Sequence, residues 1–197
     1  MLHVRQQLVV SARSGPIRLE TERLILREFA ATDAPAVLAY QSAPEFLQLM
    51  PWDEYALEHA QELVAMFLAW QQERPRLKFQ LAVTLRSSGR LIGNCGIRSE
   101  CVDAREATLG YELDPAYWGE GYATEAAMRM LELGFDALGL HRVDAGCIAD
   151  NTASARVLER LGMRLEGRLR EKEHFKEAWH DLLVYALLEQ EWRTSRE

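Results

Sequence analysis

The chain has 197 residues, which is the length of one domain with a substantial hydrophobic core. Hydrophobic residues make up 48% of it and charged residues 27%, a balance that is typical of a folded globular protein and argues against general disorder. The formal net charge of −7 argues against nucleic acid as a partner, because phosphate binding needs a concentrated basic face.

The cysteines and the apolar runs exclude further classes of protein. Cys95, Cys101 and Cys147 are widely spaced and odd in number, so the sequence predicts neither a disulfide framework nor a zinc site. No apolar run approaches the roughly 20 residues that cross a bilayer. Residues 1–15 lack the apolar core and the cleavage pattern of a signal peptide. We therefore expect a cytoplasmic protein with no membrane partner and no metal.

The N-terminal half is expected to hold one strand and two helices. Residues 1–16 form a polar leader that we interpret as a flexible arm. Residues 17–28 alternate apolar and polar side chains, which is the period of a half-buried strand. Helices are expected over residues 32–40 and 56–74, the second because its large apolar side chains recur at helical spacing.

The rest of the chain is expected to alternate strands and helices around one sheet. Strands are predicted at residues 77–86, 91–99, 105–113, 141–149, 163–174 and 178–188, and helices at 123–138 and 151–161. There is no internal repeat and no low-complexity linker. This order predicts a single α+β domain with a mixed sheet over residues 17–192, followed by a tail at 193–197.

The stretch WGEGYATE, residues 118–125, lies between an expected strand and an expected helix. Gly119 and Gly121 have no Cβ, so main-chain N–H groups there can approach a bulky anion, and the helix N-terminus adds partial positive charge. We interpret the turn as a pyrophosphate cradle; the alternative is a purely structural glycine turn. A dinucleotide-binding fold is disfavoured because Thr124 stands at the third glycine position of its fingerprint.

Taken together, the motifs resemble those of the GNAT superfamily of acetyl-coenzyme A-dependent N-acetyltransferases, and within it the Rim-type branch of ribosomal-protein N-terminal acetyltransferases. The likeness runs from residue 17 to residue 192. It is carried by TERLILRE at 21–28, LGYELDPAYWGEGYATEA at 109–126, NTASARVLERLGM at 151–163 and WHDLLVYALLEQEW at 179–192. The resemblance implies a GNAT-like domain whose mostly antiparallel sheet is splayed between the fourth and fifth expected strands and flanked by helices. It also implies acetyl-CoA as cosubstrate.

The resemblance also implies which residues bind the coenzyme. The family's usual Gln or Arg is replaced by Trp118, so main-chain amides of the turn are expected to hold the pyrophosphate. The main-chain N–H of Leu113 is expected to bind the pantetheine arm and then the oxyanion that forms when an amine attacks the thioester. The full set of expected coenzyme-binding residues is Leu113, Trp118, Gly119, Gly121, Tyr122, Ala123, Thr124, Asn151 and Ser154. For Asn151 the alternative role is that of a helix N-cap.

The acid of the reaction is less clearly marked. Many GNAT enzymes have a tyrosine seven residues after the helix asparagine, and here that residue is Leu158. The departing thiolate must then be met by Ser154, by a water, or by another tyrosine such as Tyr111 or Tyr122. We expect Ser154 to donate a hydrogen bond to the sulfur; the alternative is an exposed serine on the helix surface.

Two carboxylates are candidates for the base. Glu106 and Glu112 lie on one face of the strand that leads to the coenzyme, because side chains of even spacing share a face. For each of them the alternative is a solvated surface residue. No Ser/His/Asp or Cys/His grouping marks an activated nucleophile, so direct attack in a ternary complex is expected.

We therefore expect an N-acetyltransferase that moves acetyl from acetyl-CoA to a primary amine, with a protein N-terminal α-amine as the first candidate. An α-amine is favoured because it loses its proton more easily than a lysine does. Two alternatives are an acetyltransferase of a small molecule (an amino acid, a polyamine or an aminoglycoside) and a CoA-binding regulator without turnover. The sequence leaves open whether the chain forms a homodimer.

Overall fold

The computed structural model describes residues 16–101 and 105–196. The N-terminal arm expected at 1–16 lies outside the described residues except for Pro16. The protein folds around one eight-stranded sheet with the strand order β1-β2-β3-β4-β5-β6-β8-β7. The strands are β1 (Arg18–Glu20), β2 (Leu24–Arg27), β3 (Lys78–Leu85), β4 (Leu91–Arg98), β5 (Glu106–Leu113), β6 (Arg142–Ile148), β7 (Arg164–Phe175) and β8 (Ala178–Leu188).

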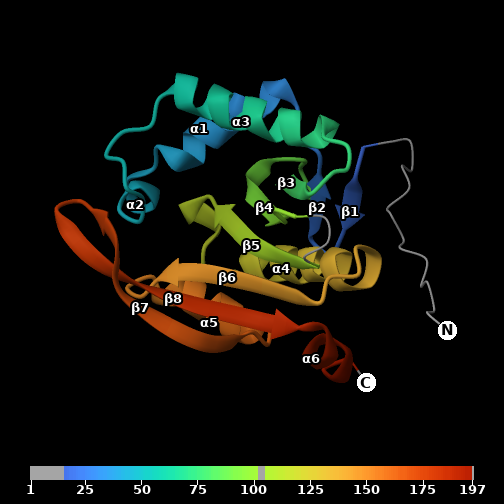
Figure 1. The fold of residues 1–197 in the computed structure, drawn as a ribbon. Coiled ribbons are helices and arrows are strands. Elements are labelled where there is room, and N and C mark those ends of the chain that lie inside the picture. Colours follow the sequence, from blue (N-terminus) through green and yellow to red (C-terminus); the bar gives the residue numbers. More distant parts are fainter. Residues whose placement is uncertain (1–15, 102–104, 197) are drawn as a thin grey trace.

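The helices cover both faces of this sheet (Figure 1). Helices α1 and α3 pack on one face, against β4 and β3, and α4 packs on the opposite face, against β4 and β5. The helices are α1 (Ala34–Gln41), α2 (Pro44–Leu47), α3 (Leu57–Gln72), α4 (Tyr122–Glu132), α5 (Thr152–Arg160) and α6 (Glu189–Thr194). The expected α+β class with one mixed, mostly antiparallel sheet is therefore confirmed.

The structure differs from the expected elements at several places, among them the short helix α2, which was not expected. The single strand expected at 17–28 is a pair of short strands, β1 and β2, because the chain turns where Thr21 N–H donates to Leu24 O at 3.0 Å. The helix expected at 123–138 changes after Glu132 into a π-helical turn. The chain ends in α6, which is held by Trp192: its buried indole N–H donates to Asp136 Oδ1 at 2.9 Å.

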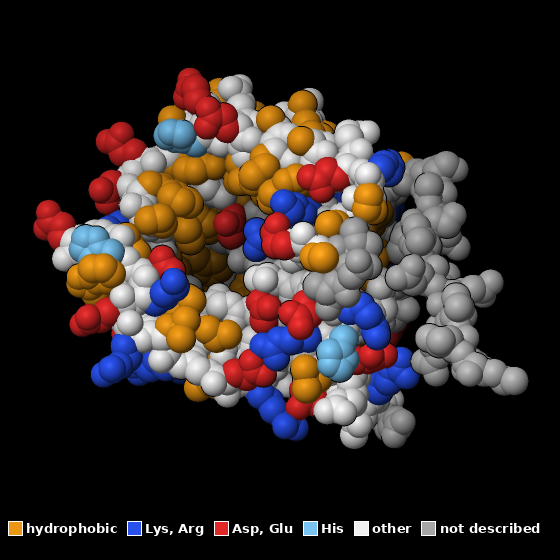
Figure 2. Space-filling view, viewed as in Figure 1, with side chains coloured by type: hydrophobic (Ala, Val, Ile, Leu, Met, Phe, Trp, Pro, Cys, Tyr) orange, Lys and Arg blue, Asp and Glu red, His pale blue; other side chains and the backbone are white. Residues whose placement is uncertain are grey.

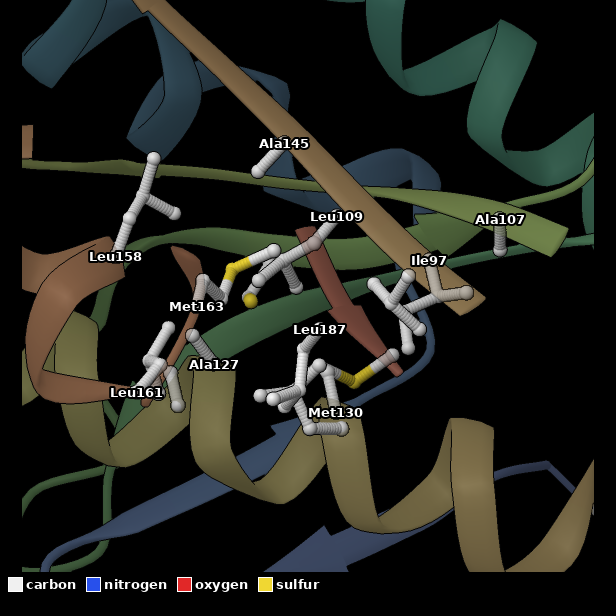
Figure 3. Close-up of a cluster of buried hydrophobic side chains, with 14 of the residues drawn as sticks. Ile97, Ala107, Leu109, Ala127, Met130, Ala145, Leu158, Leu161, Met163 and Leu187 are labelled. Carbon is white, nitrogen blue, oxygen red and sulfur yellow. The ribbon is translucent and has the colours of Figure 1, made fainter. Parts of the chain in front are cut away.

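A continuous hydrophobic core lies between the sheet and the helices α4 and α5 (Figure 3). Ala127 and Met130 are one helical turn apart on α4 and are both fully buried, which fixes the face that α4 turns to the sheet. Leu158 of α5 is 1% exposed and belongs to the same cluster. Burying one such leucine contributes about 1.5 to 3 kcal/mol. This core holds both helices against the strands that form the site.

Strands β5 and β6 run parallel and separate after a short pairing. Glu106 to Thr108 pair with Arg142 to Asp144, and neither strand is paired with the other beyond that point. β5 nevertheless continues to Leu113 and β6 to Ile148. The sheet is thus open in a V between the fourth and fifth of the strands that the sequence predicted, which confirms the expected splay.

Candidate active site

The turn before α4 presents main-chain N–H groups at a helix N-terminus. Gly119 and Gly121 have φ values of +82° and +81°, a conformation that glycine adopts without strain. The first intrahelical bond from the helix start runs from Glu125 N to Gly121 O, at 3.0 Å. The N–H groups of residues 122–124 precede it and have no intrahelical acceptor. They are available to an anion.

Two side chains complete this cradle. The Thr124 hydroxyl oxygen is buried and has no hydrogen-bond partner among residues 16–101 and 105–196. The Trp118 indole N–H donates to Leu113 O at 2.8 Å, which ties the turn to the end of β5. An unpaired hydroxyl, free amides and two glycines fit a pyrophosphate.

A cluster that the sequence analysis did not single out holds the turn in place. Arg23 donates to Glu120 O at 3.0 Å and to Glu125 Oε2 at 2.7 Å, and Thr21 Oγ1 lies 2.5 Å from Glu125 Oε1. Burial alone would raise the pKa of Glu125, but the hydrogen bonds from Thr21 and Arg23 lower it on balance. The contact joins residues about 100 positions apart, so no local pattern could have revealed it.

The end of β5 directs one N–H group into the V. Asp114 N–H donates to Ile92 O on β4 at 2.8 Å. Successive N–H groups of a strand point to opposite sides, so that of Leu113 points away from β4 and toward β6. Its carbonyl accepts a hydrogen bond from the Trp118 indole N–H. Its own N–H has no partner on that side among the described strands, because β6 pairs with β5 only as far as Thr108. Gly93 must be glycine here, because a Cβ would collide with the carbonyl of Glu112.

Ser154 and Tyr111 meet across the V on the side of α5. The Tyr111 hydroxyl lies 2.8 Å from Ser154 Oγ and 3.1 Å from Ser154 O. Burial holds the pKa of Tyr111 well above its usual value, so the phenol keeps its proton at neutral pH. Asn151 caps the helix: its Oδ1 accepts from Ser154 N–H at 3.0 Å, as the N-cap alternative predicted. The Ser154 hydroxyl is therefore a member of a half-buried hydrogen-bonded pair, not an isolated surface group.

Glu112 lies on the opposite face of β5, under α1. It accepts hydrogen bonds from Gln41 Nε2 at 2.8 Å and from Asn94 Nδ2 at 2.9 Å. Burial raises the pKa of Glu112, and the hydrogen bonds together with the nearby Arg98 charge offset only part of that rise. A carboxylate with a raised pKa is a stronger proton acceptor than an ordinary carboxylate.

The partners of Glu112 form a buried polar network. Asn94 Oδ1 accepts from Gln80 Nε2 at 2.5 Å, so the Asn94 amide nitrogen must point toward Glu112 and Tyr40. Burial, followed by the charge of Glu112, raises the pKa of Tyr40 well above its usual value, so the phenol stays protonated. The sequence analysis missed Gln80 and Asn94. The available signal was the presence of two amides at inward positions of otherwise apolar strands.

The structure separates the other expected site residues from this centre. Glu106 is exposed at the far end of β5, six residues or about 20 Å from Glu112. The Tyr122 ring lies under the Arg23 guanidinium, at 4.3 Å, at the start of α4 beside the turn 118–121. Of the two tyrosines considered for the thiolate, only Tyr111 is bonded to Ser154.

A hollow opens between the α1–α3 layer and the sheet, lined largely by hydrophobic side chains (Figure 2). The β7–β8 hairpin reaches up to α2 beside it (Figure 1). Lys176, in the turn between β7 and β8, joins the hairpin to α2: its Nζ donates a hydrogen bond to Leu47 O at 2.5 Å. Near the hairpin tip, His174 packs on Trp179 and His180 stacks on Phe175, with ring centroids 4.6 and 4.0 Å apart. Because we propose that the acceptor binds in this hollow, we call it the acceptor cleft.

Comparison with known proteins identifies the family. The model of the acetyltransferase (GNAT) domain matches residues 23–164. The uncharacterized N-acetyltransferase YoaA of Bacillus subtilis is 33% identical over 171 residues, which is 86% of this chain and 96% of YoaA. The chain belongs to the GNAT acetyltransferase family. It is therefore an acetyl-CoA-dependent N-acetyltransferase.

Solved GNAT structures agree with this fold. An acetyltransferase of the family from Bacillus anthracis superimposes with a TM-score of 0.76, at 29% identity, over 88% of this chain and 99% of that one. RimL, a ribosomal L7/L12 α-N-protein acetyltransferase solved with coenzyme A, gives a TM-score of 0.77 at 20% identity, over 87% and 98% of the two chains. The second likeness concerns the fold alone.

Two further observations bear on the expected partners of this GNAT protein. Within residues 16–101 and 105–196, no group of three His, Cys, Asp or Glu side chains is placed to hold a metal ion. None of the described helices is long and apolar enough to cross a membrane. Cys95 and Cys147 are buried, and Cys101 is exposed.

Proposed function

We propose that the protein acetylates the α-amine of a peptide or protein N-terminus by direct attack within a ternary complex. The observation that carries the proposal is the half-buried Glu112 carboxylate, which precedes Leu113 on β5 and accepts hydrogen bonds from Gln41 and Asn94. The bound acetyl-CoA supplies the acetyl thioester, held at the turn 118–124. Every other requirement of the reaction is assigned to side chains and amides of this chain.

Glu112 is the proposed base. Its carboxylate accepts a proton from the acceptor ammonium, directly or through one water, and so frees the lone pair of the nitrogen. The donors Gln41 and Asn94 hold the carboxylate in place, while burial keeps its pKa raised. Glu106 is the weaker candidate, because it is exposed at the other end of the strand.

Leu113 and Ser154 are assigned to the charges that develop on the other side of β5. The Leu113 N–H donates to the acetyl oxygen as that oxygen becomes negative. The Ser154 hydroxyl donates to the departing sulfur, with Tyr111 behind it at 2.8 Å as the group that keeps the serine oriented. We further assign pantetheine contact to Asn151 through its amide nitrogen, since its Oδ1 is used by the helix cap.

The acceptor follows from the strength of this base. An α-amine has a pKa of about 7.7 to 8.0, whereas a lysine side chain, near 10.4, costs about 3.5 kcal/mol more to deprotonate at neutral pH. A single carboxylate acting through water is a strong enough base for the α-amine, but not for the lysine side chain. RimL, whose fold is similar, also supports an α-amine acceptor, because it is an α-N-protein acetyltransferase.

The test is an acceptor panel assayed by free thiol release with acetyl-CoA at pH 7.5. It compares a peptide with a free N-terminus, the same peptide with a blocked N-terminus and an internal lysine, and spermidine. We expect the free N-terminus to give the highest kcat/KM. A higher value for the blocked peptide or for spermidine would overturn the α-amine assignment in favour of a lysine or a small molecule.

A further inference from the structure

Arg98 is a half-buried arginine on the same face of the sheet as Glu112. It ends β4, where its Cα is paired with that of Thr108. Its guanidinium occupies the space that a Cβ on Gly110 would need, so the side chain lies across β5 at Gly110 and leans toward Glu112. The missing side chain of Gly110 thus leaves the space that the Arg98 guanidinium fills.

The guanidinium has no acidic partner among residues 16–101 and 105–196. Other basic side chains of this region have an acidic partner. The ion pairs are Arg76 with Glu28 at 2.6 Å, Lys78 with Glu100 at 3.8 Å, and Arg105 with Glu189 at 3.2 Å. No carboxylate of the described residues lies within 4.0 Å of Arg98. An arginine that is partly removed from water without a partner leaves five N–H donors for a ligand, in a fork that fits a carboxylate.

The spacing along β5 sets what this ligand can be. Gly110, beneath the guanidinium, is three residues from Leu113, which corresponds to about 10 Å along a strand. The reacting amine must lie close to Leu113, while one residue of an extended peptide spans about 3.3 to 3.6 Å. A carboxylate on the second or third residue of a peptide can therefore reach Arg98 when the α-amine is at Glu112.

We propose that Arg98 is a specificity residue that binds an acidic side chain at the second or third position of the acceptor peptide. The inference rests on the proposed function, because it takes the acceptor to be an α-amine. Arg98 donates two parallel hydrogen bonds to that carboxylate and offsets its charge. The protein then binds two groups of one acceptor: the α-amine at Glu112 and the side-chain carboxylate at Arg98.

The experiment uses pairs of tetrapeptide amides with a free N-terminus that differ only by glutamate or glutamine, at the second position in one pair and at the third in the other. kcat and KM are measured for the full chain and for Arg98→Gln, Arg98→Lys and Arg164→Gln. Arg164 is the control, because it is an exposed arginine on β7 that pairs with Glu191. Thermal unfolding checks that each variant is folded.

We expect the unmodified chain to prefer glutamate at one of the two positions by about ten- to a hundredfold in kcat/KM, mainly through KM. Arg98→Gln should remove that preference by weakening only the glutamate peptide, Arg98→Lys should keep part of it, and Arg164→Gln should keep all of it. Equal rates for both members of each pair would overturn the proposal. So would an equal loss for both members in Arg98→Gln, which would mark Arg98 as a residue that only tunes Glu112.

If Arg98→Gln does not fold, Arg98→Lys decides, because an unchanged preference in that variant would contradict a bidentate contact. Failure of the proposed function gives a different pattern. No free N-terminal peptide would then be acetylated, while spermidine or the lysine peptide would be, and the inference about Arg98 would fall with it.

Discussion

The two faces of β5 present different kinds of chemical group. On the face where we propose that the coenzyme binds, the groups assigned to the ligand are mostly main-chain amides: the turn 118–124 and the Leu113 N–H. On the acceptor face they are side chains held by other side chains, with Glu112 supported by Gln41 and Asn94. We therefore expect the first face to keep its coenzyme when many of its side chains are replaced, and the second face to change its acceptor after a few substitutions.

The physical reason is the nature of each ligand. A pyrophosphate and a peptide-like pantetheine need N–H groups in a fixed geometry, which a helix start and an open strand edge supply without any particular side chain. An amine needs a proton acceptor of matched pKa, which only a side chain in a suitable environment provides. Substitutions on the two faces should therefore fail in different ways.

The largest effect is expected from Gly121→Val on the coenzyme face. A β-branched residue at a φ of +81° must strain or move the turn, so coenzyme affinity should fall by more than about a hundredfold while the fold is kept. Calorimetric titration with coenzyme A measures the loss. Gly139→Val is the control, because Gly139 also has a positive φ, +67°, outside the site. Equal coenzyme affinity of the two variants would remove the turn from the site.

Ser154→Ala should have a smaller effect, on rate alone. Losing a hydrogen bond to the departing sulfur, worth about 1.5 to 3 kcal/mol, lowers kcat by roughly tenfold to a hundredfold and leaves coenzyme affinity nearly unchanged. Steady-state rates with Tyr111→Phe serve for comparison, since a merely orienting phenol should cost less than the serine. An unaltered kcat in Ser154→Ala would show that the hydroxyl serves only the helix.

The smallest effect concerns stability on the acceptor face. The pKa of Glu112 is raised in the fold, so ionisation is less favourable there than in the unfolded chain, where it occurs near pH 4.3. As the pH rises through the folded pKa, the chain should lose stability relative to Glu112→Gln, by about 1.4 kcal/mol for each unit of pKa elevation. Denaturant titrations from pH 4 to 8 measure this difference. Parallel stability curves for the two proteins would contradict a raised pKa.

The sequence predicts the proposed coenzyme face more directly than the proposed acceptor face. WGEGYATE is contiguous, and its glycines and helix start carry the prediction by themselves. The ion pair between Arg23 and Glu125 joins segments about 100 residues apart, so local sequence patterns could not predict it. Glu112 was predicted as a candidate base from its place on β5, but Glu106 was predicted equally. Only burial and the donors Asn94 and Gln41, which come from other elements, distinguish the two.

Glu106 also provides the control for the most direct test of the account. The measurement is the pH dependence of kcat/KM with a free N-terminal peptide, between pH 5 and 9, for the unmodified chain, Glu112→Gln and Glu106→Gln. The account predicts an acidic limb for the unmodified chain and for Glu106→Gln, because activity is lost as Glu112 takes up its proton. For Glu112→Gln it predicts a rate about a hundredfold lower, with that limb absent and coenzyme affinity unchanged. A profile for Glu112→Gln that matches the unmodified chain in height and shape would contradict the account.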